Sequence, residues 1–542
     1  MSASPTFVYQ SIAQSIVDHD ITTLFGLMGD ANLFMVEHYV RHCGGEFVPV
    51  AIEGSSVLMA LAYSKTSGKV GVATITHGPA LTNCITALVE GARAHMPMVL
   101  LCGDTPAADT QNLQNIDQRE IIKTTGAGFV QIRSPETAAQ DVANAFYRAR
   151  AEKRPVVVNM PADYMWHEVK HEPIRYPVFS APSMVPEGDD FDNAIGIIAS
   201  ARRPIILAGG GAVKAKEAIV QLANRLEAPL GTTLKAKGLF NDHPFNMDIF
   251  GTLSTPQAYD LIAQSDCIIC FGTSLHPFTT DRGKLVKGKR VVQINNEVTE
   301  ISKNFHPSVA LAADAQLTAE NIIHWLDEAE IPSSQFTQEL EPFSLNKHPA
   351  SVSKSTQEGC INYVSALEKL EQALPKNRVL TTDGGRFMTE VWCRMSVPDP
   401  LSFLVTAHFG SIGLGVQVGL GASLAVTDRP VVVFSGDGGF MMGGINEFNT
   451  AVRLNRDLIL IICNDSAYGA EHIQFVDRHM DPGLSQFNWP SFAAVGTALG
   501  GEGTEVSTEA DLDRAIAAIE NRTKPLLIEL KLDPNDVPRM RV

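Results

Sequence analysis

Short apolar runs recur along the chain and alternate with stretches that have the spacing of helices. Early examples are residues 23–27, 46–50, 70–74 and 98–101. Strands that alternate with helices in this way form parallel sheets with helices on both faces. The pattern therefore predicts an α/β fold built from doubly wound parallel sheets.

The same alternation returns twice, and two segments of different composition separate the three regions. Residues 173–186 are rich in proline, and residues 332–357 are rich in serine, proline and other polar residues. Such composition is typical of linkers. We therefore expect three doubly wound domains, at residues 1–172, 187–335 and 358–542.

Composition narrows the classes of function. The chain has 542 residues, of which 45% are hydrophobic and 19% charged, as expected for a globular enzyme of two or three domains. Its net charge of −17 argues against a nucleic-acid partner. No apolar run is long enough to predict a membrane helix, and the eight scattered cysteines favour reduced thiols in the cytoplasm.

The most informative polar residues follow two apolar runs in the third region. Residues 431–434 lead into a glycine-rich turn made of Gly436, Asp437, Gly438 and Gly439. Residues 458–462 lead into Asn464 and Asp465. Ligands bind at the carboxyl ends of parallel strands, glycines allow close approach to phosphate, and hard oxygen ligands suit magnesium. The two turns therefore predict a site for magnesium and diphosphate.

Their spacing resembles the signature of thiamine diphosphate-dependent enzymes. Within that family the whole chain is similar to the acetolactate synthase, pyruvate decarboxylase and benzaldehyde lyase type. Enzymes of this type have a pyrimidine-binding domain, a central domain and a diphosphate-binding domain. The resemblance implies metal ligation by Asp437, a side chain of the second turn and the Ala467 carbonyl. The family usually has asparagine where alignment on Tyr468 and Gly469 places Asp465. The choice between Asp465 and Asn464 therefore stays open.

The resemblance assigns Glu53 to catalysis. Glu53 and Gly54 follow the expected strand at residues 46–50, where family members carry Glu-Gly. There the acid binds the pyrimidine ring of the cofactor and promotes proton removal from the thiazolium carbon. A helix N-terminal glutamate stabilised by the macrodipole is the alternative interpretation.

Two further turns resemble cofactor contacts of the family. Residues 408–413 match a turn whose backbone carbonyl holds the pyrimidine amino group and whose apolar side chain separates the rings, which implies Gly410 and Ile412. Residues 383–387 match a loop that contacts the diphosphate, which implies Gly385 and Arg386. A surface position for Arg386 is the alternative.

Several residues are candidates on the substrate side. Asp30 and Glu471 stand where pyruvate decarboxylases have catalytic acids, although they also suit a turn and a solvated helix. The decarboxylase His-His pair is absent, and Gln114 instead fits the glutamine of synthases and benzaldehyde lyase. His77, before Gly78-Pro79, is a candidate imidazole, with a backbone-bonded turn histidine as the alternative; His408 and His472 are weaker candidates.

The resemblance implies an enzyme that requires thiamine diphosphate and Mg²⁺ and joins or breaks a carbon–carbon bond. The expected substrates are a 2-oxo acid, which loses carbon dioxide, and a carbonyl acceptor. Alternatives are a decarboxylase that releases an aldehyde, an acyloin lyase, a flavin-linked oxidase and an inert homologue. The central residues 209–211, 237–238 and 279–282 match an FAD site only faintly, which favours a domain without FAD. Family sites lie between subunits, so we expect a homodimer or homotetramer.

Overall fold

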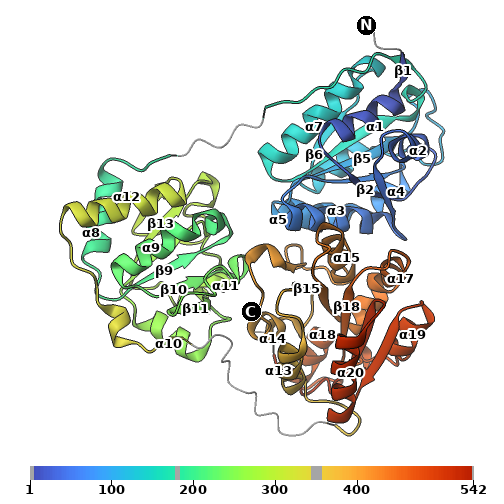
Figure 1. The fold of residues 1–542 in the computed structure, drawn as a ribbon. Helices are drawn as coiled ribbons and strands as arrows, with labels where there is room; N and C mark the ends of the chain where they lie inside the picture. The colour runs from blue at the N-terminus through green and yellow to red at the C-terminus, as the bar shows by residue number, and fades with distance from the viewer. Residues whose placement is uncertain (1–4, 178–183, 344–356, 540–542) are drawn as a thin grey trace.

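The computed structural model describes residues 5–177, 184–343 and 357–539. We call these segments the N-terminal, central and C-terminal units. Each unit contains one six-stranded parallel sheet with helices around it (Figure 1). The expected doubly wound α/β fold is confirmed.

The N-terminal sheet has the strand order β3-β2-β4-β5-β7-β6. Its strands are β2 (Thr23–Gly26), β3 (Glu46–Pro49), β4 (Gly71–Ile75), β5 (Met98–Asp104), β6 (Gly128–Gln131) and β7 (Pro155–Pro161). Its helices are α1 (Val8–Asp18), α2 (Leu33–Arg41), α3 (Glu53–Ser67), α4 (Pro79–Thr82), α5 (Ile85–Ala94), α6 (Gln118–Thr124) and α7 (Ala138–Glu152). A separate antiparallel pair joins β1 (Thr6–Phe7) to β8 (Glu168–Val169).

The central sheet has the order β11-β10-β9-β12-β13-β14. Its strands are β9 (Pro204–Ala208), β10 (Leu230–Thr232), β11 (Asn246–Ile249), β12 (Cys267–Phe271), β13 (Arg290–Asn295) and β14 (Val309–Ala312). The helices around it are α8 (Asp189–Ala199), α9 (Lys216–Leu226), α10 (Pro256–Gln264), α11 (Pro277–Thr280) and α12 (Ala315–Glu328).

The C-terminal sheet has the order β16-β15-β17-β18-β20-β19. Its strands are β15 (Val379–Thr382), β16 (Phe403–Val405), β17 (Val431–Gly436), β18 (Leu458–Asn464), β19 (Glu502–Val506) and β20 (Leu526–Lys531). Its helices are α13 (Tyr363–Ala373), α14 (Met388–Arg394), α15 (Gly415–Ala425), α16 (Asp437–Gly439), the π-helix η8 (Phe440–Gly444), α17 (Ile445–Arg453), α18 (Gly469–Asp477), α19 (Phe492–Ala498) and α20 (Glu509–Asn521).

Short 3₁₀ turns complete the described structure. They are η1 (Pro135–Thr137), η2 (Ala162–Tyr164), η3 (Gly210–Ala215), η4 (Leu234–Ala236), η5 (Val298–Glu300), η6 (Phe336–Glu339), η7 (Pro400–Ser402) and η9 (Pro482–Ser485). Over the described ranges, no helix has both the length and the apolar character needed to cross a bilayer.

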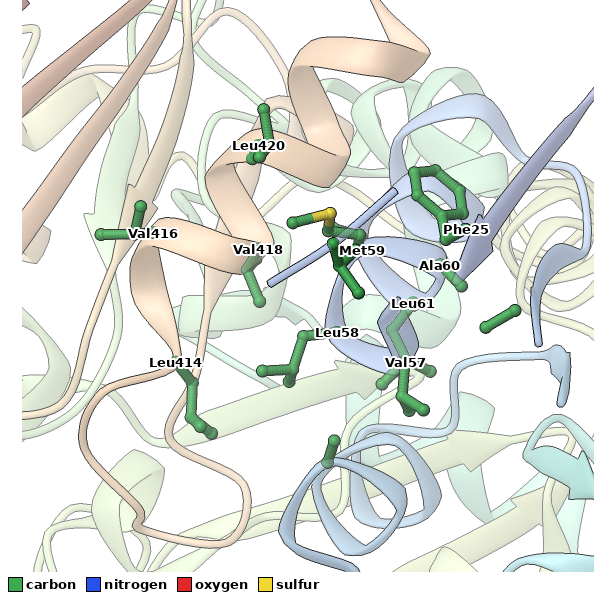
Figure 2. Packing of buried hydrophobic residues seen from close by; sticks show 14 of the residues in the cluster. Phe25, Val57, Leu58, Met59, Ala60, Leu61, Leu414, Val416, Val418 and Leu420 are labelled. Atoms are coloured by element: carbon green, nitrogen blue, oxygen red, sulfur yellow. The ribbon is translucent and has the colours of Figure 1, made fainter. Parts of the chain in front are cut away.

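The N-terminal and C-terminal units pack together through α3 and α15 (Figures 1 and 2). Side chains of both helices belong to one buried apolar cluster, and α3 is buried on nearly all sides because it also covers its own sheet. A Cβ atom at Gly421 would lie 2.3 Å from the Met59 carbonyl oxygen. Glycine at this position therefore permits the close approach of the two helices.

The described ranges include only part of the two expected linkers. Residues 178–183 and 344–356 lie outside the described ranges. The described start of the second linker differs from an open connection, because Phe336 is 2% exposed and packs in a cluster with Ile205 and Leu207. The Ser334 amide also donates to the Leu226 carbonyl at 3.1 Å. One buried aromatic side chain thus holds a polar stretch against the central unit.

Candidate functional site

Asp437 lies at the carboxyl end of β17, where the strand turns directly into helix. One carboxylate oxygen accepts a hydrogen bond from the Gly438 amide at 2.8 Å. The other accepts from the Ala467 amide at 3.2 Å and from the Trp489 indole at 2.9 Å. The residue is only 3% exposed. The side chain is therefore fixed between the ends of β17 and β18.

A second buried acid, Asp465, follows β18. Burial raises the pKa of Asp437, and the negative charge of Asp465 raises it further. Burial also raises the pKa of Asp465, while Arg386, whose guanidinium lies 3.6 Å from its carboxylate, opposes that rise. Two acids that disfavour each other's charge would be stabilised by a cation between them.

Asn464, the competing candidate, has a different environment. Its amide nitrogen donates to Glu529 at 2.7 Å, and its amide oxygen accepts from the Ser466 amide at 3.0 Å. Asn464 is 1% exposed, whereas Asp465 lines a cavity. The side chain of Asn464 is thus already engaged inside the sheet.

Arg386 is buried rather than at the surface. It is 3% exposed, and its guanidinium donates to the Gly469 carbonyl at 3.3 Å and to the Pro534 carbonyl. The surface alternative for this arginine is therefore wrong. It places a positive charge beside Asp465.

The other expected cofactor contacts lie around the same cavity. Gly410, with φ +81°, is exposed, and Ile412 is partly exposed. A Cβ atom at Gly438 would lie 2.5 Å from the Tyr468 ring, which explains glycine in this turn. The expected contacts that line the cavity are Gly385, Arg386, Gly410, Ile412, Gly436, Asp437, Gly438, Gly439, Asp465, Ala467, Tyr468 and Gly469.

The cavity has a volume of about 1410 Å³ and extends from the acid pair into the central unit. In the central unit, Gly210, Gly211 and Thr279 line the cavity. Lys237, another residue of the faint FAD match, is 2% exposed and is paired with Asp248 at 3.5 Å. Only part of the expected FAD match therefore faces the cavity.

The N-terminal unit gathers the other candidates at its own sheet edge. The Asn83 amide donates to a carboxylate oxygen of Glu53 at 3.0 Å, and Glu53 is the first residue of α3. A Cβ atom at Gly78, next to His77, would lie 2.3 Å from the Gln114 carbonyl oxygen. The turns that carry His77 and Gln114 are therefore in contact.

His77 and Asp30 differ in exposure. His77 is 6% exposed, and its Nδ1 atom has no hydrogen-bond partner among the described residues. A bond from Nδ1 to the turn backbone therefore does not account for this histidine. Asp30 is exposed and lies in the loop after β2, where a Cβ atom at Gly29 would lie 2.7 Å from Thr76.

The two groups of candidates do not line the same cavity among the described residues. The described part of the N-terminal unit contributes Lys65, Lys153 and residues 93–97 to the cavity lining, and not Glu53, Asp30, His77 or Gln114. Glu471, exposed on α18, lines the cavity on the side of the acid pair. Of the two candidate acids, Glu471 thus lines this cavity and Asp30 does not.

Sequence reasoning missed residues that support the site from a distance. Trp489 binds Asp437 from 52 positions further along the chain. Asp383, whose pKa is raised by burial, accepts from the Gly413 amide at 3.0 Å and from the Leu414 amide at 3.2 Å. Glu447 is fully buried and accepts from the Ala51 amide at 3.0 Å, close to Glu53. Only the adjacency of Asp383 to the Gly385 loop gave a signal in the sequence.

Three models of known protein domains match the chain. Residues 7–125 match the model "Thiamine pyrophosphate enzyme, N-terminal TPP binding domain". Residues 191–322 match "Thiamine pyrophosphate enzyme, central domain", and residues 383–530 match "Thiamine pyrophosphate enzyme, C-terminal TPP binding domain". The chain belongs to the thiamine pyrophosphate enzyme family. Both TPP-binding domains of the family are thus present, which supports thiamine diphosphate as its cofactor.

Relatives of this thiamine pyrophosphate enzyme carry several names. A sulfoacetaldehyde acetyltransferase of Castellaniella defragrans is 27% identical over 96% of this chain and 92% of its own length. A probable 2-ketoarginine decarboxylase of Pseudomonas aeruginosa is 26% identical over 96% of this chain and 93% of its own length. The acetolactate synthase isozyme 1 large subunit of Escherichia coli is 26% identical over 89% of this chain and 86% of its own length.

Proposed function

We propose that this thiamine pyrophosphate enzyme uses Mg²⁺ and thiamine diphosphate to join a fragment of a decarboxylated 2-oxo acid to a carbonyl acceptor. The observation that carries the proposal is the buried pair Asp437 and Asp465 at the end of two parallel strands beside a glycine turn. This chemistry fits the acetolactate synthase among the relatives.

The residues at this edge suit a metal ion held jointly with a diphosphate. Within the described ranges, no three His, Cys, Asp or Glu side chains form a complete metal site. Magnesium is commonly held by one or two carboxylates together with phosphate oxygens. Asp437, Asp465 and the Ala467 carbonyl supply such an incomplete set, and we choose Asp465 over Asn464 because the Asn464 side chain is engaged by Glu529.

The catalytic role of Glu53 follows from the chemistry of the cofactor. When bound, thiamine diphosphate supplies a carbon nucleophile and an electron sink. Glu53 holds a proton at the pyrimidine ring nitrogen. Asn83 binds one carboxylate oxygen of Glu53, which orients the carboxyl group and leaves its second oxygen for the ring.

A complete site then requires two chains. Glu53 is absent from the described lining of the cavity that contains Asp437, so one chain would place its glutamate at the cofactor held by its partner. Large apolar side chains near these edges are open to solvent in one chain: Leu113 is 102% exposed, Leu484 89% and Met442 56%. Such residues suit a subunit interface. We propose a homodimer as the smallest active unit, with a homotetramer as the larger alternative.

The substrate would lie between the two sheet edges. His77, whose Nδ1 atom is unpaired among the described residues, and Gln114 would contact it from one chain, and Glu471 from the other. Asp30 would join the first group. We propose that these polar side chains hold or move protons on the substrate, and that the protein acts in the cytoplasm without bound FAD.

Simple decarboxylation to an aldehyde is the second candidate function. The acids Asp30 and Glu471 favour it, because a pair of acids could protonate the product. In the dimer, Asp30 of one chain would meet Glu471 of the other. The probable 2-ketoarginine decarboxylase among the relatives gives it further support.

Product analysis distinguishes the two functions. The protein with Mg²⁺ and thiamine diphosphate is given pyruvate and a panel of other 2-oxo acids, with and without an aldehyde acceptor. Carbon dioxide release that yields a hydroxyketone product and accelerates with acceptor supports carboligation. Release of free aldehyde at a rate independent of acceptor supports decarboxylation. If none of the 2-oxo acids releases carbon dioxide although thiamine diphosphate binds, both functions are contradicted.

A further inference from the structure

Helix α5 of the N-terminal unit contacts the loop that carries Gly410 and Ile412 in the C-terminal unit. Glu90, on α5, is 4% exposed. One of its carboxylate oxygens accepts from the His408 ring at 2.7 Å and from the His408 amide at 3.2 Å. The other accepts from the Phe409 amide at 2.7 Å. A single buried carboxylate thus receives three hydrogen bonds from two consecutive loop residues.

Arg93, one helical turn after Glu90, adds a second contact to the same loop. Its guanidinium lies 4.7 Å from the centre of the Phe409 ring. Residues three positions apart lie on the same face of a helix, so α5 presents both side chains to the loop. A guanidinium over an aromatic face is attracted to the ring. The two contacts together fix the loop immediately before Gly410.

The loop is also held immediately after Ile412. Asp383 accepts hydrogen bonds from the Gly413 and Leu414 amides, at 3.0 and 3.2 Å. Two buried carboxylates therefore hold the residues on either side of the segment from Gly410 to Ile412. Glu90 binds the residues before the segment, and Asp383 binds those after it. Gly410 has φ +81°, and a Cβ atom built on it would have no neighbour within 4 Å, so no side chain packs against the turn at that point.

We propose that Glu90 is a positioning residue that sets where the Gly410 carbonyl and the Ile412 side chain lie relative to the cofactor bound by the same chain as Glu90. The inference rests on the proposed function, which assigns Gly410 and Ile412 to the pyrimidine part of the cofactor. Each N-terminal unit then serves both sites of a dimer. Its Glu53 acts on the partner's cofactor, and its Glu90 prepares the loop for the cofactor of its own chain.

The alternative is that Glu90 only attaches the two units to each other. The apolar contact of α3 with α15 already joins them through a continuous buried cluster (Figure 2). Removing the Glu90 carboxylate should therefore leave the units attached and alter the loop. An affinity measurement separates this local effect from a general loss of stability.

The first experiment compares Glu90→Gln and Arg93→Met with a matched control, Asp141→Asn. Asp141 is a 3% exposed carboxylate of the same unit that accepts from the Arg133 amide at 3.1 Å and from the Thr137 hydroxyl at 2.7 Å. It therefore resembles Glu90 in burial and in loop contacts, but the loop that it holds does not line the cavity, whereas His408, which Glu90 holds, does.

We expect Glu90→Gln to weaken thiamine diphosphate affinity about tenfold and to slow proton exchange at the thiazolium carbon when the cofactor is saturating. The neutral amide removes the negative charge from all three hydrogen bonds and replaces one acceptor oxygen with a donor. Arg93→Met should have a smaller effect of the same kind. Asp141→Asn should lower the melting temperature without either change. Equal affinity and exchange in Glu90→Gln and Asp141→Asn would overturn the proposal.

The second experiment asks which site each lesion affects. Chains with Glu53→Gln are mixed with chains carrying Glu90→Gln, at a cofactor concentration that leaves Glu90→Gln poorly active, and chain exchange is verified. The mixed dimer should contain one intact site, made from the unaltered Glu53 of one chain and the unaltered loop of the other, so activity should rise above that of either parent.

The two proposals fail in distinguishable ways. A parallel mixture of Glu53→Gln with Asp437→Ala tests the shared site without Glu90. If that mixture regains activity and the Glu90 mixture does not, Glu90 acts through Glu53 and the positioning proposal is wrong. If neither mixture regains activity, the shared site is wrong, and the affinity comparison alone decides the role of Glu90. If the unaltered protein does not bind thiamine diphosphate, the proposed function itself fails.

Discussion

The N-terminal and C-terminal units have the same strand order but carry different polar side chains at the ends of their strands. Counted from the first strand of each parallel sheet, both have the order 2-1-3-4-6-5, whereas the central sheet has the order 3-2-1-4-5-6. The C-terminal edge presents two buried acids beside glycines, and the N-terminal edge presents Glu53, His77 and Gln114. One topology thus supports two roles, because the loops at the strand ends determine what each edge binds.

Removing the acid of the N-terminal edge should have the largest effect. We expect Glu53→Gln to retain thiamine diphosphate and Mg²⁺ binding but to lose proton exchange at the thiazolium carbon and turnover by on the order of a hundredfold or more. Glu37→Gln, an exposed helix position of the same unit, is the matched control. Near-normal exchange in Glu53→Gln would remove Glu53 from the catalytic role.

A smaller effect should separate Asn464, the last residue of β18, from Asp465, which follows it. A chelator should abolish activity and Mg²⁺ should restore it, with Asp465→Ala needing more metal because it removes a ligand. Asn464→Ala should instead lower the free energy of unfolding by about 1–3 kcal/mol, since Glu529 loses a buried hydrogen-bond donor.

Magnesium titration and urea denaturation of both variants measure this difference. If Asn464→Ala weakens metal affinity more than Asp465→Ala, the assignment of the ligand is off by one residue. If both variants behave alike in both measurements, neither side chain has the role that its contacts indicate.

The sequence was most informative where function depends on neighbouring residues. The turn around Asp437 is contiguous and follows an apolar run, so both the strand and its chemistry could be predicted. Trp489 and Glu90 could not, because their contacts with Asp437 and His408 join residues 52 and 318 positions apart. Long-range side-chain contacts leave no local pattern of spacing.

Packing also determined the outcomes that sequence reasoning left open. Arg386 fits either a surface or a buried position by residue type, and the carbonyls of Gly469 and Pro534 hold it inside. The proposed choice of Asp465 over Asn464 rests on Glu529, a residue of a strand that begins far beyond both. The start of the second linker packs against the central unit because a single aromatic side chain, Phe336, is buried there.

The central claim is that the two sheet edges of a working site belong to different chains. Inactive Glu53→Gln chains are mixed with inactive Asp437→Ala chains under conditions in which chain exchange is verified, and turnover is measured with Mg²⁺ and thiamine diphosphate. Random pairing should create dimers in which one site carries both lesions and the other carries neither, so partial activity should return. Verified exchange without any return of activity would contradict the shared site.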